Sequence, residues 1–172
     1  MIIVSSLNHA AEAFRLYQPA YVVSILDVDE PTIPIFESLA AKDHIRLIGN
    51  SSRNDNNNSI GQSMRCEKIL NLAQRWKSEK ENSTILIHCN EGAARSMAVA
   101  FILMCAVDSD ISEKDIAKRL REAAPHADPN LLLISEADAA LKREDRMIQA
   151  ILDLCPSCAT GANPIVALPL AA

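Results

Sequence analysis

The sequence lacks long hydrophobic segments and is poor in aromatic residues. Phe, Trp and Tyr together make up only 3% of its 172 residues. The longest apolar run, 97–107, is too short for the roughly 20 residues that a membrane-spanning helix needs, so we predict no membrane partner. The chain also opens without a cationic segment that leads into an apolar run and a cleavage site, which predicts a cytoplasmic protein rather than a secreted one.

Cysteine is also scarce, and its spacing is irregular. An odd number of cysteines favours a reducing compartment over a disulfide framework. The five cysteines are Cys66, Cys89, Cys105, Cys155 and Cys158. The last two have the spacing of half a zinc or redox site, but no second pair of ligands accompanies them. We therefore predict no metal and no cofactor.

Positive charge is in short supply. The chain has 17 Lys and Arg against 22 Asp and Glu, which gives a net charge of −5. Proteins that bind the phosphate backbone of DNA or RNA need clustered Lys and Arg, so we predict no nucleic acid as a partner. An acidic protein can still bind a phosphate group, but it must do so at a local positive site.

The pattern of hydrophobic residues predicts an α/β fold. Runs of β-branched residues without alternation are typical of strands that are buried on both faces. The polar segment 49–59, rich in Asn and Ser, is predicted as a loop. The predicted strands are 2–6, 21–26, 44–48 and 84–88, and the predicted helices are 8–16, 65–79, 95–107, 113–124, 129–141 and 146–154.

Two of these helices carry clear start signals. Ser112 with Asp115 fits a capping box, and Asp128 followed by Pro129 fits an N-cap with proline at the first helical position. Because strands alternate with helices first and helices dominate later, we predict a central, mostly parallel sheet of four to five strands. Helices flank this sheet, and a C-terminal helical cluster closes it. We expect a single domain over 1–154 and a flexible tail over 155–172.

The segment between the last predicted strand and the helix 95–107 carries the candidate chemistry. Five residues separate Cys89 from Arg95. A loop of this length can wrap backbone N–H groups around a tetrahedral oxyanion at a helix N-terminus, and an arginine offers a planar fork for two phosphate oxygens. We expect phosphate, sulfate or a similar oxyanion to bind here. The predicted phosphate-binding residues are Asn90, Glu91, Gly92, Ala93, Ala94 and Arg95.

The same geometry activates the cysteine. The converging N–H groups, the helix end and Arg95 all favour the thiolate, which is the nucleophilic form. Ser96 is expected to donate its hydroxyl to the sulfur, and Gly92 to allow a turn that a Cβ would obstruct. We expect His88 to hydrogen-bond the loop backbone and support its shape. The opposing interpretation is that Cys89 is an ordinary buried cysteine, but the full His-Cys-x-x-Gly-x-x-Arg-Ser string argues against it.

This string resembles the signature loop of the protein tyrosine phosphatase superfamily, and the short chain is similar to its compact dual-specificity-like branch. The segments 128–130 and 137–141 are similar to a bacterial group of small tyrosine-phosphatase-like proteins. The resemblance covers most of residues 20–150, and the loop is its specific part. It implies a phosphatase that hydrolyses phosphate monoesters through a phosphocysteine intermediate at Cys89. The expected substrate is a phosphorylated protein, phosphotyrosine above all, or a small phosphate monoester.

The resemblance also implies a general acid, an aspartate on the loop after the strand that precedes the signature strand. In the bacterial group this acid is expected near position 51, where the present chain has Ser51. Asp55 is the only carboxylate of this loop, and we predict it as the acid because a flexible loop can swing it over the site. Asp27 and Asp29, after the previous strand, stay open as alternatives. Each of the three can equally be an ordinary turn aspartate.

Rival functions share features of this loop. A catalytically weak or inactive phosphate-binding module of the same fold would need only the loop and Arg95, and the unusual acid segment favours it. A sulfur-transfer enzyme of the rhodanese kind also uses a loop cysteine, but its loop is typically one residue shorter. Phosphoinositide-directed relatives tend to place basic residues in the loop. This chain has Asn90, Glu91, Ala93 and Ala94 instead, which disfavours a polyanionic substrate.

Overall fold

A five-stranded sheet forms the centre of the computed structural model, which describes residues 1–48, 59–78, 83–108, 110–158 and 163–170. The strands are β1 (Ile2–Ser6), β2 (Tyr21–Leu26), β3 (His44–Ile48), β4 (Ile85–Cys89) and β5 (Val166–Leu168). They lie in the order β3-β2-β4-β1-β5. The first four strands pair in parallel, and β5 pairs antiparallel with β1. The predicted α/β fold with a mostly parallel sheet is confirmed.

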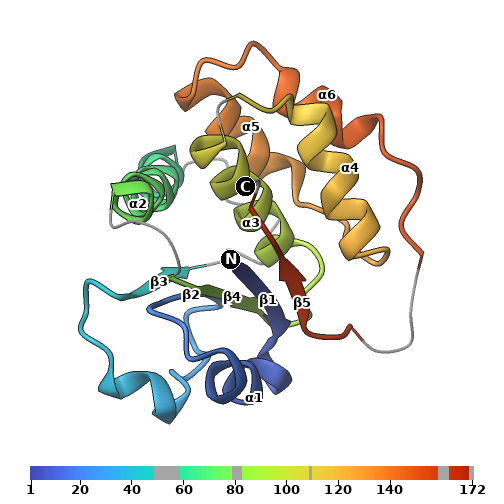
Figure 1. Cartoon of the computed structure of the whole chain (residues 1–172). Helices are drawn as coiled ribbons and strands as arrows, with labels where there is room; N and C mark the ends of the chain where they lie inside the picture. Colours follow the sequence, from blue (N-terminus) through green and yellow to red (C-terminus); the bar gives the residue numbers. More distant parts are fainter. Residues whose placement is uncertain (49–58, 79–82, 109, 159–162, 171–172) are drawn as a thin grey trace.

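Helices cover both faces of the sheet (Figure 1). One face carries α1 (Leu7–Tyr17) and the short 3-10 helix η1 (Pro34–Ser38). The other face carries the larger helical layer. Its members are α2 (Ser59–Ser78), α3 (Arg95–Val107), α4 (Glu113–Ala123), α5 (Leu131–Ala140) and α6 (Arg146–Leu152). The last three form the C-terminal helical cluster that the sequence predicts.

The strands divide their side chains between two hydrophobic clusters, because successive residues of a strand point to opposite faces. Ile2 and Val4 of β1 join the large cluster with α3, whereas Ile3 joins the smaller cluster with α1 and Phe36 of η1. The helix α3 is apolar on every side, and all residues from 96 to 105 are buried. A helix that is surrounded by protein in this way has a fixed position, and its first turn therefore presents Arg95 and Ser96 rigidly.

The start of α5 differs from the prediction. The N-cap is Asn130, whose side-chain oxygen accepts a hydrogen bond from the Leu133 N–H at 3.1 Å, rather than Asp128. The backbone N–H groups of Asp128 and Asn130 donate instead to the carbonyls of Ala93 and Ala94, at 3.1 and 3.3 Å. Residues 128–130 are therefore held against the loop that precedes α3, and the helix begins after them. By contrast, Ser112 caps α4 as predicted, by accepting from the backbone N–H of Asp115.

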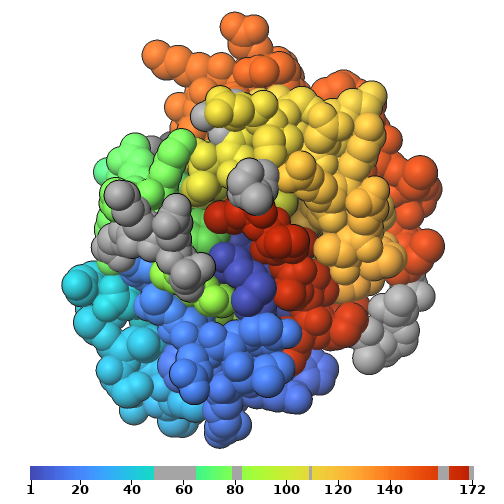
Figure 2. All heavy atoms as spheres, viewed as in Figure 1, coloured from blue at the N-terminus to red at the C-terminus, as the bar shows by residue number. Residues whose placement is uncertain are grey.

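Part of the segment that the sequence predicts as a flexible tail lies in the sheet. Val166–Leu168 forms β5, and both Val166 and Leu168 are buried. The strand packs on α4 and covers the free edge of β1, as the red segment in Figure 2 shows. This is a correction to the expectation for 155–172. The alternation of apolar residues at 166, 168 and 170 is the period-2 pattern of an edge strand with one covered face.

No helix of the described ranges is long and apolar enough to cross a membrane. In the same ranges, the His, Cys, Asp and Glu side chains form no group of three or more with the geometry to hold a metal ion. Cys155 and Cys158 are both exposed and carry free thiols.

Candidate active site

The predicted loop lies beyond the carboxyl ends of three parallel strands. Cys89 is the last residue of β4, and it pairs in register with Ser6 of β1 and Ile25 of β2. The chain then turns through residues 90–94 and enters α3 at Arg95. In open α/β sheets this edge is where ligands bind, and a helix that begins at the same point adds backbone N–H groups and a favourable dipole for an anion.

Gly92 allows the loop to pass directly over the end of β1. Its φ is +75°, a conformation that residues with a side chain rarely adopt, and a Cβ at this position would lie 2.7 Å from the backbone nitrogen of Ser6 and 2.8 Å from the carbonyl carbon of Ser5. No flexible side chain is available to move away from that contact. The predicted role of Gly92 as the residue that permits the turn is therefore explained by the neighbouring strand as well as by φ.

Four carbonyl groups of the loop are turned outward by hydrogen bonds to the surrounding structure. The carbonyl of Asn90 accepts from the Leu7 N–H at 3.2 Å, and that of Glu91 accepts from the side-chain amide of Asn163 at 2.8 Å. The carbonyls of Ala93 and Ala94 accept from residues 128 and 130. Because the N–H of a peptide group points opposite to its C=O, the N–H groups that follow these carbonyls face the interior of the loop.

The Cys89 thiol occupies the centre of this ring and is 2% exposed. The Gly92 N–H donates to the sulfur at 3.2 Å, and the Ser96 hydroxyl oxygen lies 3.2 Å from it. Ser96 is fully buried in the first turn of α3. The sulfur is therefore surrounded by a backbone N–H, a hydroxyl group and the N-terminus of α3. The predicted contact between Ser96 and Cys89 is present.

The guanidinium group of Arg95 is held by two partners at the rim of the loop. One terminal nitrogen donates to the Asp27 carboxylate at 2.9 Å, and the other donates to the side-chain oxygen of Asn90 at 3.0 Å. The amide nitrogen of Asn90 in turn lies 3.4 Å from the Glu30 carboxylate. Among the described residues, two of the five N–H donors of Arg95 are thereby used, and the other three can serve an oxyanion.

The segment that supplies Asp27 and Glu30 is itself anchored by Arg46 of β3. Arg46 donates to the Thr32 hydroxyl at 3.0 Å, to the Asp27 carbonyl at 3.2 Å and to the Glu30 carbonyl. An arginine fork that binds several acceptors fixes their relative positions. The connection between β2 and η1 is therefore part of the site, although its sequence has no pattern that marks it as such.

His88 makes a different contact from the one that the sequence predicts. Its Nε2 atom lies 2.6 Å from the Ser24 hydroxyl of β2, and its Nδ1 atom is buried with no hydrogen-bond partner among the described residues. The expected bond to the loop backbone is therefore replaced by a bond across the sheet. The cause is register: Ser24 pairs with His88, so their side chains share one face. Burial lowers the pKa of His88 to about 3, with smaller contributions from His44 and Arg46.

The candidate general acids divide into three cases. Asp55, our predicted acid, lies outside the described residues. Asp27 forms the ion pair with Arg95. Asp29 is exposed on the turn that follows β2. Of the predicted phosphate-binding residues, Glu91 has an exposed side chain, and Ala93 and Ala94 are half-buried.

Sequence analysis missed several residues of this arrangement, and only some of them left a signal. The missed residues are Ser24, Glu30, Arg46 and Asn163. A serine within the otherwise apolar strand 21–26 is a usable signal, because a buried polar group needs a partner.

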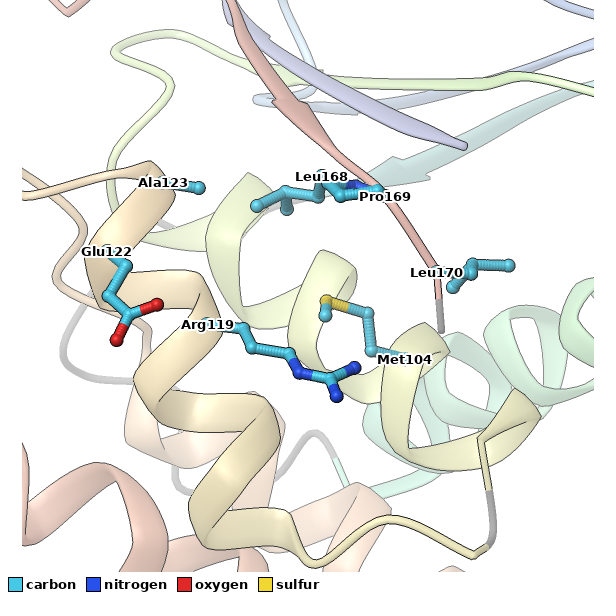
Figure 3. A pocket seen from close by; sticks show the side chains of 7 residues that line it. All are labelled: Met104, Arg119, Glu122, Ala123, Leu168, Pro169 and Leu170. Carbon is cyan, nitrogen blue, oxygen red and sulfur yellow. The ribbon is translucent and has the colours of Figure 1, made fainter. Parts of the chain in front are cut away.

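A separate cavity of about 450 Å³ lies away from the loop, between α3, α4 and the β5 segment, and Met104, Arg119 and Leu168 are among the residues that line it (Figure 3).

The fold has close counterparts among solved structures. No family model and no curated protein matches the sequence. The Cydia pomonella PTP-2 phosphatase superposes with a TM-score of 0.61 at 18% identity, over 80% of this chain and 84% of that one. Human DUSP28 gives a TM-score of 0.58 at 15% identity, over 83% and 94% of the two chains. PTPMT1, solved in complex with PI(5)P, gives 0.58 at 10% identity, over 84% and 94%.

At identities this low, the superpositions show a common fold and nothing beyond it. The chain has the fold of the dual-specificity and tyrosine phosphatases over most of its length, which confirms the fold that the loop motif implied. The similarity to a bacterial group of such proteins stays a prediction.

Proposed function

We propose that this chain is a cysteine-dependent phosphatase that hydrolyses phosphate monoesters through a phosphocysteine intermediate at Cys89. The observation that carries the proposal is the loop from Cys89 to Arg95, with its carbonyls bonded outward, its N–H groups directed inward and a buried thiol at the centre. A ring of donors around a nucleophile suits a tetrahedral anion whose charge grows on its equatorial oxygens as the ester bond breaks.

The reaction uses the residues in two steps. The Cys89 thiolate attacks phosphorus, the bond from phosphorus to the ester oxygen breaks, and the leaving oxygen takes a proton from a general acid. Loop N–H groups and the three remaining donors of Arg95 bind the phosphoryl oxygens. A water molecule then attacks phosphorus, the sulfur–phosphorus bond breaks, and the Ser96 hydroxyl donates to the departing thiolate. Phosphate leaves, and the acid has regained its proton from water.

The charges around the loop favour a phosphoprotein over a polyanionic lipid headgroup. PTPMT1 is a structural counterpart that was solved with a phosphoinositide, so this substrate class needs a direct comparison. In the present chain Arg95 is the one cationic side chain of the loop, and the carboxylates of Asp27 and Glu30 stand beside it. Additional phosphate groups would meet these two carboxylates, and the nearby Arg46 already donates to the carbonyls of Asp27 and Glu30. We therefore propose phosphotyrosine in proteins as the substrate, with small aryl phosphates as surrogates.

The first prediction tests the nucleophile. Cys89→Ser should abolish turnover of an aryl phosphate, because serine has no comparable anion at neutral pH, while binding of phosphate or tungstate to the loop should persist. Cys66→Ser, which alters a buried cysteine of α2 outside the loop, is the matched control and should keep its activity. Turnover and oxyanion affinity are measured on the same preparations. Near wild-type turnover in the Cys89 variant would rule out the phosphocysteine mechanism.

A second candidate function is a phosphate-binding module with little activity. The ion pair between Asp27 and Arg95 favours this function, since the ion pair engages one of the alternative acids.

The second prediction separates the phosphatase from the binding module by the leaving group of the substrate. If Asp55 is the acid, Asp55→Asn should slow an alkyl phosphate by about a hundredfold or more, the range of general acid catalysis. A nitrophenyl phosphate should slow much less, because nitrophenolate departs without a proton. Wild-type protein that hydrolyses neither ester but binds phosphate would be the module.

A further inference from the structure

A serine hydroxyl bridges two histidine rings beneath the loop. Ser24 of β2 lies 2.6 Å from Nε2 of His88 and 2.8 Å from Nε2 of His44. Ser24 and His88 are almost completely buried, whereas His44 on the edge strand β3 is half-buried. Phe36 of η1 packs against both rings, with centroid distances of 5.4 Å to each. The three polar side chains therefore form one chain of hydrogen bonds from the sheet edge to the residue before Cys89.

The number of protons in this chain permits two arrangements. A neutral imidazole carries one N–H, and a serine hydroxyl has one proton to donate. For both bonds to form, one Nε2 atom must carry a proton and donate to the serine oxygen, and the other must be bare and accept from the hydroxyl. In the first arrangement Nε2 of His88 is the donor. In the second arrangement Nε2 of His44 is the donor, and the proton of His88 then sits on Nδ1.

A positive charge on His44 is compatible with the second arrangement only, because a protonated imidazole has no bare nitrogen. With His44 neutral, the first arrangement is favoured, since the second would leave a buried N–H on His88 Nδ1 without an acceptor among the described residues. We propose that Ser24 and His44 are positioning residues that set the tautomer of His88, and that protonation of His44 moves the proton of His88 from Nε2 to Nδ1.

The proton balance of this step is simple. One proton from solvent is added to the whole chain. His88 releases its Nε2 proton to the serine oxygen as the serine passes its own proton to Nε2 of His44, and His88 takes up one proton at Nδ1. His44 then carries the net positive charge, and His88 stays neutral throughout.

The difference in burial places that net charge on His44, because His88 is completely buried and His44 is half-buried. Burial is the main cause that lowers the pKa of both rings, to about 3 for His88, and Arg46 lowers both further. His44 is also one of the groups that lower the pKa of His88. The other groups placed against the pair are Ser24 from β2, Ser5 from β1, which pairs in register with His88, and Phe36 from η1, and they carry no charge. The transition is therefore expected below pH 6.5, the ordinary value for histidine.

The consequence for Cys89 rests on the proposed function. Nδ1 is bonded to the ring carbon next to Cβ, so it lies nearer to the main chain, and to the adjoining Cys89, than Nε2 does. The second arrangement thus brings the ring N–H closer to the main chain that joins His88 to Cys89, although the two side chains point to opposite faces of the sheet. We expect this change to make Cys89 more reactive and to extend the acidic side of the activity profile.

Nitrogen-detected NMR of the histidine rings tests the tautomer directly. In the full chain labelled with ¹⁵N, the proton of His88 should move from Nε2 to Nδ1 as His44 titrates. Ser24→Thr keeps the hydroxyl, and Ser24→Val has the shape of the threonine variant without the hydroxyl. The movement of the His88 proton should therefore persist in the first variant and vanish in the second. His44→Phe, at a partly exposed edge position, should also abolish it. A His88 tautomer that stays constant through the titration of His44 in wild type would overturn the proposal.

Alkylation of Cys89 by iodoacetamide, followed by mass spectrometry of its peptide, tests the effect on the nucleophile without any turnover. Below the His44 titration, Ser24→Val should react about threefold more slowly than Ser24→Thr, the scale on which a nearby partial charge acts on one ionisable group. Above it the two rates should agree. Equal rates at all pH values would show that the pair does not position the nucleophile. If wild-type protein gives the expected NMR and alkylation results but has no phosphatase turnover, only the proposed function is contradicted.

Discussion

Arg95 uses some of its N–H groups to hold its own position and offers the others to a ligand. The donors bound to Asp27 and Asn90 fix the plane of the guanidinium group, and the other three donors have no partner among the described residues and can bind a ligand. Holding a charged group in place before the substrate arrives avoids reorganisation in the transition state. We propose that Asp27 orients Arg95, a role that differs from the role of proton donor that the sequence left open for it.

The third prediction distinguishes these two roles of Asp27. Asp27→Asn removes the ion pair, so the guanidinium should become less well positioned and turnover should fall by roughly ten- to a hundredfold, the cost of a small misplacement. As an orienting residue, Asp27 should affect nitrophenyl and alkyl phosphates equally. A loss confined to the alkyl ester would identify it as the acid instead. Asp29→Asn, on the exposed turn two residues later, is the control and should change neither rate.

At the residue scale, sequence analysis could predict Cys89 and Arg95 as site residues because the spacing of the loop is local. Cys89, Gly92, Arg95 and Ser96 all lie within one turn between a strand and a helix. The partners of that loop come from distant segments, and nothing near them in the sequence shows the contact. Asn163 is an ordinary polar residue until the fold brings its amide to the Glu91 carbonyl.

At the scale of elements, the loop is fixed by β1, by α1 and by residues 128–130, which precede α5. At Gly92 the loop lies directly against the backbone of β1 at Ser5 and Ser6. The loop therefore cannot shift outward without losing the hydrogen bonds of its carbonyls, and it cannot shift inward without displacing β1.

The fourth prediction concerns that approach. Gly92→Ala should destabilise the protein by roughly 2 kcal/mol or more, since the positive φ and the contact with β1 both oppose a Cβ. Urea unfolding of the variant and of wild type measures the difference. Ala93→Gly is the control in the next position and should cost only about 0.5–1 kcal/mol, the usual entropic effect of glycine. Equal stability of wild type and Gly92→Ala would contradict the observed path of the loop.

The elements that the sequence predicted well are those with strong local patterns. The buried strands and α3 are continuous apolar runs, and their bounds agree with the structure within about one residue. The strand β5 has only three residues, and its neighbours are Pro, Ala and Gly, which are typical of a disordered tail. Its order comes from pairing with the opposite end of the chain, and the alternation at 166, 168 and 170 is too short to distinguish a strand from a tail by itself.

At the scale of the whole molecule, buried histidine makes the folded state sensitive to acid. His88 has a pKa of about 3 in the folded protein against an ordinary 6.5, so the unfolded chain binds the proton more readily. The stability that neutral His88 contributes is fully present above pH 6.5 and is lost as the pH falls toward 3. The pKa values of His44 and His126 are also lowered by burial and act in the same direction.

The fifth prediction follows from this difference. Between pH 6.5 and 3 the wild type should lose up to roughly 5 kcal/mol of unfolding free energy through His88. His88→Asn should start from a lower stability and decline less steeply, because asparagine does not titrate. Urea unfolding at a series of pH values compares the two slopes. Parallel slopes would show that His88 is charged in the folded protein or accessible to water.

The pairing of β5 with β1 also determines which contacts can form first while the chain is being synthesised. Ribosomes add about 5–20 residues each second, so Asn163 and β5 are made roughly 4–15 seconds after the loop at Cys89. In that interval the nascent chain can already pair β1 with β4, but the outer edge of β1 is open and the Glu91 carbonyl lacks its donor. A ribosome that stalls before residue 163 would therefore display an unpaired strand edge to neighbouring chains. Translation of the last strand both seals that edge and completes the anchoring of the loop.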